Sequence, residues 1–160
     1  RQPARRMIRH AGLIARRLAG AWRGVLIEGR SGSGKSDLAL RALDAGFRLV
    51  ADDRTVVFVS RARFFVPAAP ALRGLIEARG LGVEPAFHLA FAPIALVARC
   101  AGEAGAVERL AQPAFETLLG IAVPAVDLWP LAASAPAVLD LAIERLGARR
   151  QQAYQARFRA

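Results

Sequence analysis

The sequence of 160 residues contains a single cysteine, Cys100, which has no second cysteine in the chain to pair with. A small scaffold held together by disulfides is therefore excluded, and we expect a reducing compartment, the cytoplasm. Long apolar runs are missing as well. One of the longest stretches, Phe87–Val97, includes a histidine and a proline and is too short to cross a bilayer. We therefore predict a soluble protein without a transmembrane helix or a membrane partner.

Lysine is equally scarce, because Lys35 is the only lysine among 23 basic residues and all the others are arginine. A formal charge of +10 would ordinarily suggest nucleic-acid binding. Arginine and alanine are abundant throughout, which indicates a coding bias, and the basic excess lies mainly at the two ends. We expect solvated or acid-facing ends and no dedicated nucleic-acid binding. The acid-free residues 1–23 also resemble a transit peptide, but they lack a cleavage-like or serine-rich segment.

Apolar residues make up 54% of the chain and charged residues 22%, a composition typical of a packed protein rather than a disordered one. A chain of this length can bury roughly two thirds of the surface that its unfolded form exposes. The sequence shows no internal repeat and no long flexible linker. We therefore expect a single α/β domain over residues 1–160.

The pattern of apolar runs and glycines predicts alternating strands and helices. The expected strands are Gly24–Glu28, Phe47–Ala51, Thr55–Ser60, Arg63–Val66, Ala92–Cys100 and Ile121–Leu128, and the expected helices are Lys35–Ala45 and Pro136–Arg150. Ala71–Arg79 fits a helix or a strand, and Gly80–Gly82 fits a turn. In open α/β sheets, ligands collect at the carboxyl ends of the strands, so site residues are expected there.

A glycine-rich loop follows the first expected strand. It satisfies the pattern G-x-x-x-x-G-K-[ST] with Gly29, Arg30, Ser31, Gly32, Ser33, Gly34, Lys35 and Ser36. In such a loop the backbone N–H groups and the helix N-terminus bind phosphate, Lys35 reaches the β/γ-phosphates and Ser36 offers its hydroxyl to Mg²⁺. A chance match in a glycine-rich turn is the alternative. The only lysine of the chain stands at the phosphate position, which favours nucleotide binding.

Two adjacent carboxylates, Asp52 and Asp53, follow the second expected strand. We expect this pair to lie on the same rim of the sheet as the glycine loop. Adjacent carboxylates repel each other unless a cation or a proton intervenes, so we assign one to Mg²⁺ and the other to a substrate proton, as general base. A solvated turn or a helix cap is the alternative.

The segment Phe47–Arg54 resembles part of the catalytic domain of the HPr kinase/phosphorylase family. A second segment, Leu75–Val83, looks like the family's signature around its metal-binding glutamate. The resemblance extends over about residues 8–146, which we take as the core between arginine-rich tails. It is strongest to the short proteobacterial form that lacks the amino-terminal domain, and it implies a P-loop fold with a mixed sheet flanked by helices.

The resemblance assigns roles to five residues. Lys35 matches the catalytic lysine that binds phosphate, and Ser36 and Glu77 match the serine and glutamate that bind magnesium. Asp53 matches the acid that takes a proton from the substrate serine, and Asp52 matches its neighbour, which we place at the metal. The implied cofactors are ATP and Mg²⁺.

Two further residues resemble catalytic residues of the family. His10 resembles a catalytic histidine ahead of the P-loop, although about four residues around Arg16–Trp22 look inserted between them. Arg109 resembles a catalytic arginine of the more variable half. A surface position is the alternative for both. His88 lacks a motif and is interpreted as structural, and Cys100 as a small core residue.

The implied function is serine phosphorylation of a small HPr-type phosphocarrier protein, by a homo-oligomer that is commonly a hexamer. The family's basic loop for dephosphorylation corresponds to Ala122–Pro130, which has no lysine or arginine, so kinase activity is favoured over phosphorylase activity. A small-molecule kinase or plain ATPase stays open as an alternative, as does a nucleotide-dependent binding module whose basic ends hold nucleic acid or an acidic partner.

Overall fold

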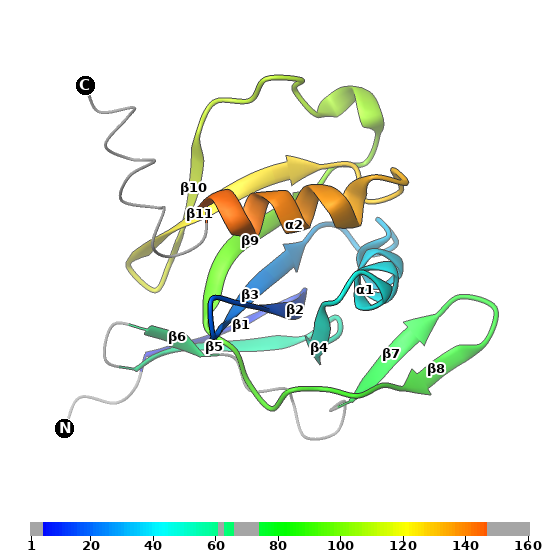
Figure 1. The fold of residues 1–160 in the computed structure, drawn as a ribbon, viewed down its shortest axis with the longest axis horizontal. Coiled ribbons are helices and arrows are strands. Elements are labelled where there is room, and N and C mark those ends of the chain that lie inside the picture. Colours follow the sequence, from blue (N-terminus) through cyan, green and yellow to red (C-terminus); the bar gives the residue numbers. More distant parts are fainter. Residues whose placement is uncertain (1–4, 61–62, 66–73, 147–160) are drawn as a thin grey trace.

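The fold is built on a six-stranded mixed sheet, seen in a computed structural model that describes residues 5–60, 63–65 and 74–146 (Figure 1). The strand order is β10-β11-β9-β3-β2-β4. These strands are β2 (Ala11–Leu18), β3 (Ala21–Glu28), β4 (Arg48–Ala51), β9 (Ile94–Cys100), β10 (Ala114–Leu118) and β11 (Ile121–Leu128). Strands β3, β9 and β11 are parallel neighbours, whereas β10 pairs antiparallel to β11 and β2 pairs antiparallel to both β3 and β4.

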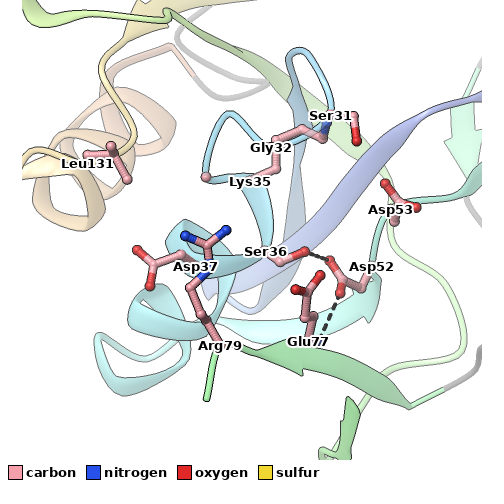
Figure 2. Close-up of a pocket in the computed structure, with 11 residues that line it drawn as sticks. Ser31, Gly32, Lys35, Ser36, Asp37, Asp52, Asp53, Glu77, Arg79 and Leu131 are labelled. Atoms are coloured by element: carbon pink, nitrogen blue, oxygen red, sulfur yellow. Dashed lines mark hydrogen bonds between the residues drawn. The ribbon is translucent and has the colours of Figure 1, made fainter. Parts of the chain in front are cut away.

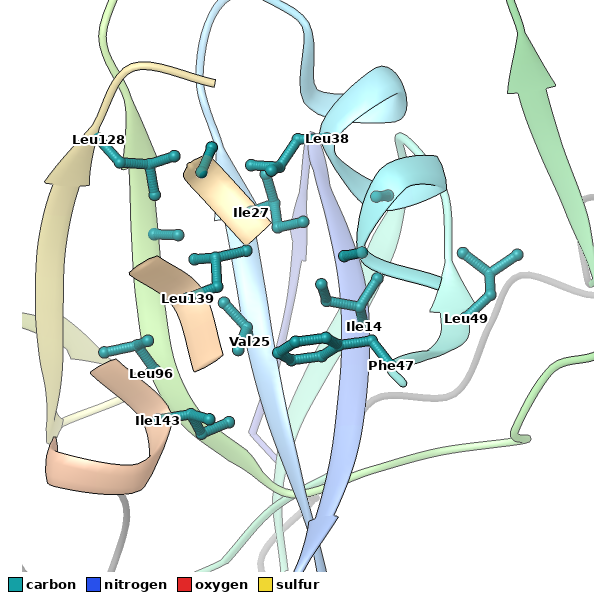
Figure 3. Close-up of a cluster of buried hydrophobic side chains, with 14 of the residues drawn as sticks. Ile14, Val25, Ile27, Leu38, Phe47, Leu49, Leu96, Leu128, Leu139 and Ile143 are labelled. Carbon is teal, nitrogen blue, oxygen red and sulfur yellow. The ribbon is translucent and has the colours of Figure 1, made fainter. Parts of the chain in front are cut away.

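Two helices, α1 (Lys35–Asp44) and α2 (Ala135–Leu146), cover one face of this sheet (Figure 3). On α2, Leu139 and Ile143 are four residues apart, so they lie on one side of the helix, and both are fully buried. They pack in one cluster with Phe47 and with Leu38 of α1. Burial of each such side chain contributes about 1.5–3 kcal/mol. No helix in the described part of the chain is long and apolar enough to cross a membrane.

The opposite face is covered by a small sheet of order β1-β5-β6. Its strands are β1 (Arg6–Arg9), β5 (Thr55–Ser60) and β6 (Arg63–Phe65). Val57 of β5 is fully buried against Leu13 and Leu26 of the large sheet. A third sheet, the hairpin of β7 (Leu75–Ala78) and β8 (Gly82–Pro85), extends beyond α1, and a short 3-10 helix η2 (Ala104–Ala106) follows β9 (Figure 1).

The prediction of a mixed α/β sheet with flanking helices is confirmed, with the difference that both helices lie on the same face. All expected strands and both helices are present, and the ambiguous Ala71–Arg79 contains a strand over Leu75–Ala78. Residues 66–73 and 147–150, which belong to some of these predictions, lie outside the described residues. Four strands were not predicted: β1, β2, β8 and β10.

Strand β2 was missed because its sequence, AGLIARRL, has two arginines near its end and lies within an arginine-rich start. Its first five residues are nevertheless buried, since β2 lies between β3 and β4 in the sheet. Because β2 is antiparallel to both neighbours, β3 and β4 run in the same direction. The loop after β3 and the residues after β4 therefore lie on the same rim, as expected, but one strand apart.

Candidate active site

The glycine loop connects β3 directly to α1, which begins at Lys35. The Lys35 side chain is buried, with 8% of the residue's surface exposed, and its Nζ donates hydrogen bonds to the carbonyl oxygens of Gly29 at 2.6 Å and Arg30 at 3.1 Å. Gly34 precedes the helix with φ 103° and offers no side-chain cap. The first N–H groups of α1 thus have no capping side chain there, and an anion can accept their hydrogen bonds.

Two glycines of the loop, Gly29 and Gly34, are required by close contacts. A Cβ on Gly29 would lie 2.8 Å from Ser33 Oγ and 2.9 Å from the Cβ of Cys100, and a Cβ on Gly34 would lie 2.9 Å from Leu131 Cδ2. Ser33 Oγ is buried without a hydrogen-bond partner among the described residues. Burial raises the pKa of the Cys100 thiol to about 11, against the opposing charge of Lys35. Cys100 is therefore a neutral packing residue, as predicted.

The acidic side of the site is built around Asp52, which joins two other elements (Figure 2). Ser36 Oγ donates to Asp52 Oδ1 at 2.8 Å, and the backbone N–H of Glu77 donates to Asp52 Oδ2 at 3.1 Å. Burial raises the pKa of Asp52, the two hydrogen bonds oppose this, and the nearby carboxylates of Asp53 and Glu77 raise it further. The carboxylate thus lies in a place where negative charge is disfavoured unless a cation is bound.

Asp53 has an unusual backbone conformation. Its φ is 65°, in the left-handed region, and the N–H of Arg54 donates to the carbonyl of Asp52 at 2.8 Å. This contact from residue i+2 to residue i closes a tight turn, and its central residue has a positive φ that is uncommon outside glycine. Strained residues of this kind cluster at functional sites. The turn places Asp53 at the edge of the cleft described next.

The glycine loop and the aspartates border one cleft with a volume of about 410 Å³. The residues that line it are Ser31, Gly32, Gly34, Lys35, Ser36, Asp37, Asp52, Asp53, Glu77, Arg79 and Leu131 (Figure 2). The structure thus brings together the predicted glycine loop, the aspartate pair and the glutamate. Sequence reasoning missed Asp37, Arg79 and Leu131. Arg79 stands in the quoted signature segment and Asp37 follows the motif, so both had a signal, whereas Leu131 had none.

His10 and Arg109 do not line this cleft. His10 is an exposed residue between β1 and β2, and its neighbour Ala11 pairs with Glu28, the residue before the glycine loop. The apparent insertion around Arg16–Trp22 forms the other end of the β2–β3 hairpin, so it does not separate His10 from the loop. Arg109 lies exposed in a turn between η2 and β10, in the segment that follows the carboxyl end of β9.

The stretch Ala122–Pro130, compared above with a basic loop, forms most of β11 and is therefore mainly a strand. The loop that follows it, Trp129–Ser134, reaches the cleft through Leu131. Arg41 of α1 holds this loop, because its Nη1 donates to the carbonyl oxygen of Ala132 at 3.0 Å and its Nη2 donates to that of Pro130. The loop also has no lysine or arginine of its own.

The donor set of the cleft suits a hard cation. Ser36, Asp52, Asp53 and Glu77 supply only hydroxyl and carboxylate oxygens, the ligands that Mg²⁺ prefers. Among residues 5–60, 63–65 and 74–146, no three His, Cys, Asp or Glu side chains form a complete metal site. Mg²⁺ is usually bound by one or two carboxylates together with phosphates and water, so a partial protein site fits this ion.

Comparisons with known proteins point to one family. Residues 4–87 match the family described as HPr Serine kinase C-terminal domain, a range that includes the glycine loop, the aspartate pair and Glu77 and ends before Arg109. The HPr kinase/phosphorylase of Levilactobacillus brevis is 46% identical over 67 residues, which cover 41% of this chain and 22% of that protein. The Lactococcus lactis HPr kinase/phosphorylase is 52% identical over 62 residues, covering 38% and 20%. The chain thus spans about a fifth of these relatives' length.

One solved structure extends the likeness of fold to nearly the whole chain. It is the Hpr(Ser) kinase/phosphatase from Coxiella burnetii, which matches with a TM-score of 0.76 over 96% of this chain and 97% of that chain. The two sequences are 21% identical, so this match supports the fold alone.

Proposed function

Because the chain belongs to the HPr serine kinase C-terminal domain family, we propose that it is an ATP-dependent kinase that phosphorylates a serine on a small HPr-type phosphocarrier protein. One observation carries the proposal. The carboxylate of Asp52 joins Ser36, at the start of the phosphate-binding helix, to the backbone of Glu77 in a separate hairpin. The P-loop and the acidic residues thereby form one site that suits Mg²⁺ and the phosphates of ATP.

In this site Ser36, Asp52 and Glu77 would hold Mg²⁺, which would supply charge neutralisation for the transferred phosphate. The backbone N–H groups at the start of α1 bind the phosphates. Lys35 holds carbonyls of its own loop in this structure, and a phosphate would replace the carbonyl of Gly29 or Arg30 as its partner. Its ammonium group is thus already beside the phosphate position before the nucleotide binds.

Asp53 is the proposed general base, because it lines the cleft and does not hydrogen-bond to Ser36 as Asp52 does. It would take the proton from the serine hydroxyl of the carrier as that oxygen attacks the γ-phosphorus and the bond to ADP breaks. His10 and Arg109, on neighbouring segments at the same rim, complete the proposed catalytic set. The loop after β11 has no basic residue, so kinase activity is favoured over phosphorylase activity.

The remaining parts of the proposal concern the whole molecule. We propose one domain over residues 1–160, with arginine-rich tails around the core of residues 8–146. We propose a cytoplasmic homo-oligomer, a hexamer by resemblance. A P-loop small-molecule kinase or ATPase, or a nucleotide-dependent binding module, would share the glycine loop without using a carrier protein.

The test is transfer of labelled phosphate from ATP with Mg²⁺ to purified HPr-type carriers. We expect transfer to a carrier serine by the wild type, and its loss in Lys35→Ala. Asp53→Asn should lower the transfer rate by about 10²–10⁴-fold, the usual contribution of a general base, while ATP binding persists. Asparagine tolerates the left-handed conformation, so this variant should also keep the melting temperature of the wild type.

Asp53→Ala is the matched control, because it removes the same carboxylate but is strained at φ 65° by about 1–2 kcal/mol. Asp53→Ala should therefore be less stable than Asp53→Asn and equally inactive. Bound ATP without transfer to any carrier would overturn the protein-kinase proposal in favour of the small-molecule kinase or the binding module. A salt-sensitive nucleic-acid complex unaffected by Lys35→Ala would indicate the binding module.

A further inference from the structure

The corner between β1 and β2, which carries His10, is held from both sides. On one side Arg9 Nε donates to Glu28 Oε1 at 2.7 Å, and the two side chains are 31% and 16% exposed. On the other side the hydroxyl of Thr55 donates to the carbonyl oxygen of Ala11 at 2.6 Å. Thr55 is fully buried. Among the described residues, the buried polar or charged ones are Thr55 and Lys35.

Both contacts come from residues next to the proposed site. Glu28 directly precedes Gly29, the first residue of the glycine loop, and Thr55 follows the aspartate pair by two residues. The strand pairing also links the residues beside His10 to these two segments, because Ala11 is paired with Glu28 and Arg9 is paired with Thr55. The residues on either side of His10 are therefore each bound to one of the two segments that carry the glycine loop and the aspartates.

We propose that Thr55 and the Arg9–Glu28 ion pair are positioning residues that set His10 relative to the glycine loop and Asp53. This inference rests on the proposed function, in which His10 takes part in phosphate transfer. His10 is exposed and lies on a corner between two sheets, so its own packing does not determine its place. A buried hydroxyl and an ion pair restrict the positions of Ala11 and Arg9, the residues on either side of His10. Supporting contacts of this kind hold a catalytic group in its productive geometry.

Thr55→Val removes the hydroxyl contact, and Glu28→Gln removes the charge of the ion pair with Arg9. Valine has nearly the shape of threonine but no hydroxyl, and glutamine keeps the length of glutamate but no charge. A displacement of a reacting group by about 1 Å lowers the rate up to about a hundredfold. We expect each variant to lower kcat for transfer by roughly ten- to a hundredfold while the KM for ATP stays unchanged. Thr55→Ser, which keeps the hydroxyl, should restore most of the rate.

Asp127→Asn is the matched control. Asp127 accepts hydrogen bonds from Arg99 at 2.8 and 3.1 Å in the same sheet, and Arg99 is in register with Glu28, but this pair does not flank His10. Its loss should leave kcat unchanged. A fall in kcat with Asp127→Asn equal to that of Glu28→Gln would overturn the proposal, because it would show a general effect of ion pairs in the sheet.

A second measurement does not depend on transfer. The chain has two histidines, so the NMR signals of the His10 ring and amide can be assigned with a His10→Gln variant. Thr55→Val and Glu28→Gln should shift and broaden the His10 signals, whereas Asp127→Asn should not. Unchanged His10 signals in both variants would overturn the proposal. Altered signals in both variants, together with no transfer by the wild type, would uphold the positioning role while the kinase function fails.

Discussion

The two sides of the cleft are constructed differently. On the glycine-loop side, Gly29 to Ser36 are consecutive residues, and Lys35 binds carbonyls only five and six positions earlier in the chain. On the acidic side, Asp52 binds Ser36, 16 positions away, and the N–H of Glu77, 25 positions away. The first side is made by local sequence and the second by contacts between distant elements.

This difference predicts two kinds of sensitivity. The glycine loop is close-packed against β9 and the loop after β11, so added volume should damage it. The acidic side holds a carboxylate in a partly buried place, so its charge state and the bound cation should matter more than volume. The following experiments test this contrast.

The largest effect is expected from Gly29→Ala on the glycine-loop side. The new Cβ would lie 2.9 Å from the Cβ of Cys100, which is attached to the β9 backbone and cannot move away easily. We expect a loss of about 1–3 kcal/mol in the free energy of unfolding, the usual cost of overpacking, together with weakened ATP binding. Urea unfolding and calorimetric titration with ATP measure both.

Gly102→Ala is the control for added volume. Gly102 follows the same strand but has no atom within 4 Å of an added Cβ and no positive φ. Its stability should change by less than about 0.5 kcal/mol. Equal unfolding free energies for the two alanine variants would show that the loop is not close-packed against β9.

An intermediate effect is expected from Asp52→Asn on the acidic side. Burial raises the pKa of Asp52, so the folded state keeps this proton to higher pH than the unfolded chain does. The stabilisation from this group is complete below its ordinary pKa and is lost as pH rises through the raised value. At neutral pH without Mg²⁺, the asparagine variant should therefore be more stable than the wild type, and the difference should vanish in acid.

The side-chain amide that this substitution introduces can preserve both hydrogen bonds, because its oxygen accepts from the N–H of Glu77 and its nitrogen donates to the Ser36 hydroxyl. Urea unfolding over a pH series without metal measures the predicted difference. With Mg-ATP the order should reverse, because the wild type gains more from the bound cation. A variant that is less stable than the wild type at neutral pH without metal would contradict the assignment of a disfavoured charge.

The smallest effect is expected from Arg41→Gln, which tests how the loop with Leu131 is held over Gly34. Its guanidinium donates to two loop carbonyls and to Asp37, and the side chain is 30% exposed. We expect a loss of about 1 kcal/mol, below the usual range for bonds to charged groups because solvent screens the site. ATP affinity, measured by calorimetric titration, should fall a few-fold.

Arg99→Gln provides the comparison for Arg41. Arg99 is exposed to a similar degree, 34%, and binds the carboxylates of Glu116 and Asp127 rather than loop carbonyls. It should lower stability by a similar amount without changing ATP affinity. An equal loss of affinity in the two variants would remove the special role of Arg41.

Parts of the site were predictable because they depend on short-range rules. The strand, loop and helix around Lys35 follow from apolar runs, glycines and a fixed spacing. The position of Asp52 and Asp53 on the same rim followed from the rule for strand ends, and their place beside the loop is as expected. Glu77 was found through the resemblance of its segment, since its neighbours in sequence carry no other signal of contact with Asp52.

Other parts could not be predicted because their partners are far apart in the chain. The arginines of β2 hid a strand that lies inside the sheet, and burial of that strand depends on its neighbours β3 and β4. Leu131 belongs to no motif, and Arg41 resembles every other surface arginine of the sequence. Their roles at the cleft emerge only when α1 and the loop after β11 are placed side by side.

Residue type and spacing along the chain were enough to identify the glycine loop, its single lysine and most of the secondary structure, and the resemblance of two segments pointed to the family. Only the folded arrangement shows that Asp52 joins Ser36 to Glu77, that Leu131 lies over Gly34 and that the corner at His10 is held by Glu28 and Thr55. The physical reason is how far apart in the sequence the interacting residues lie. Backbone conformation responds to adjacent residues, whereas hydrogen bonds and close packing join whichever groups the folded chain brings within a few ångströms.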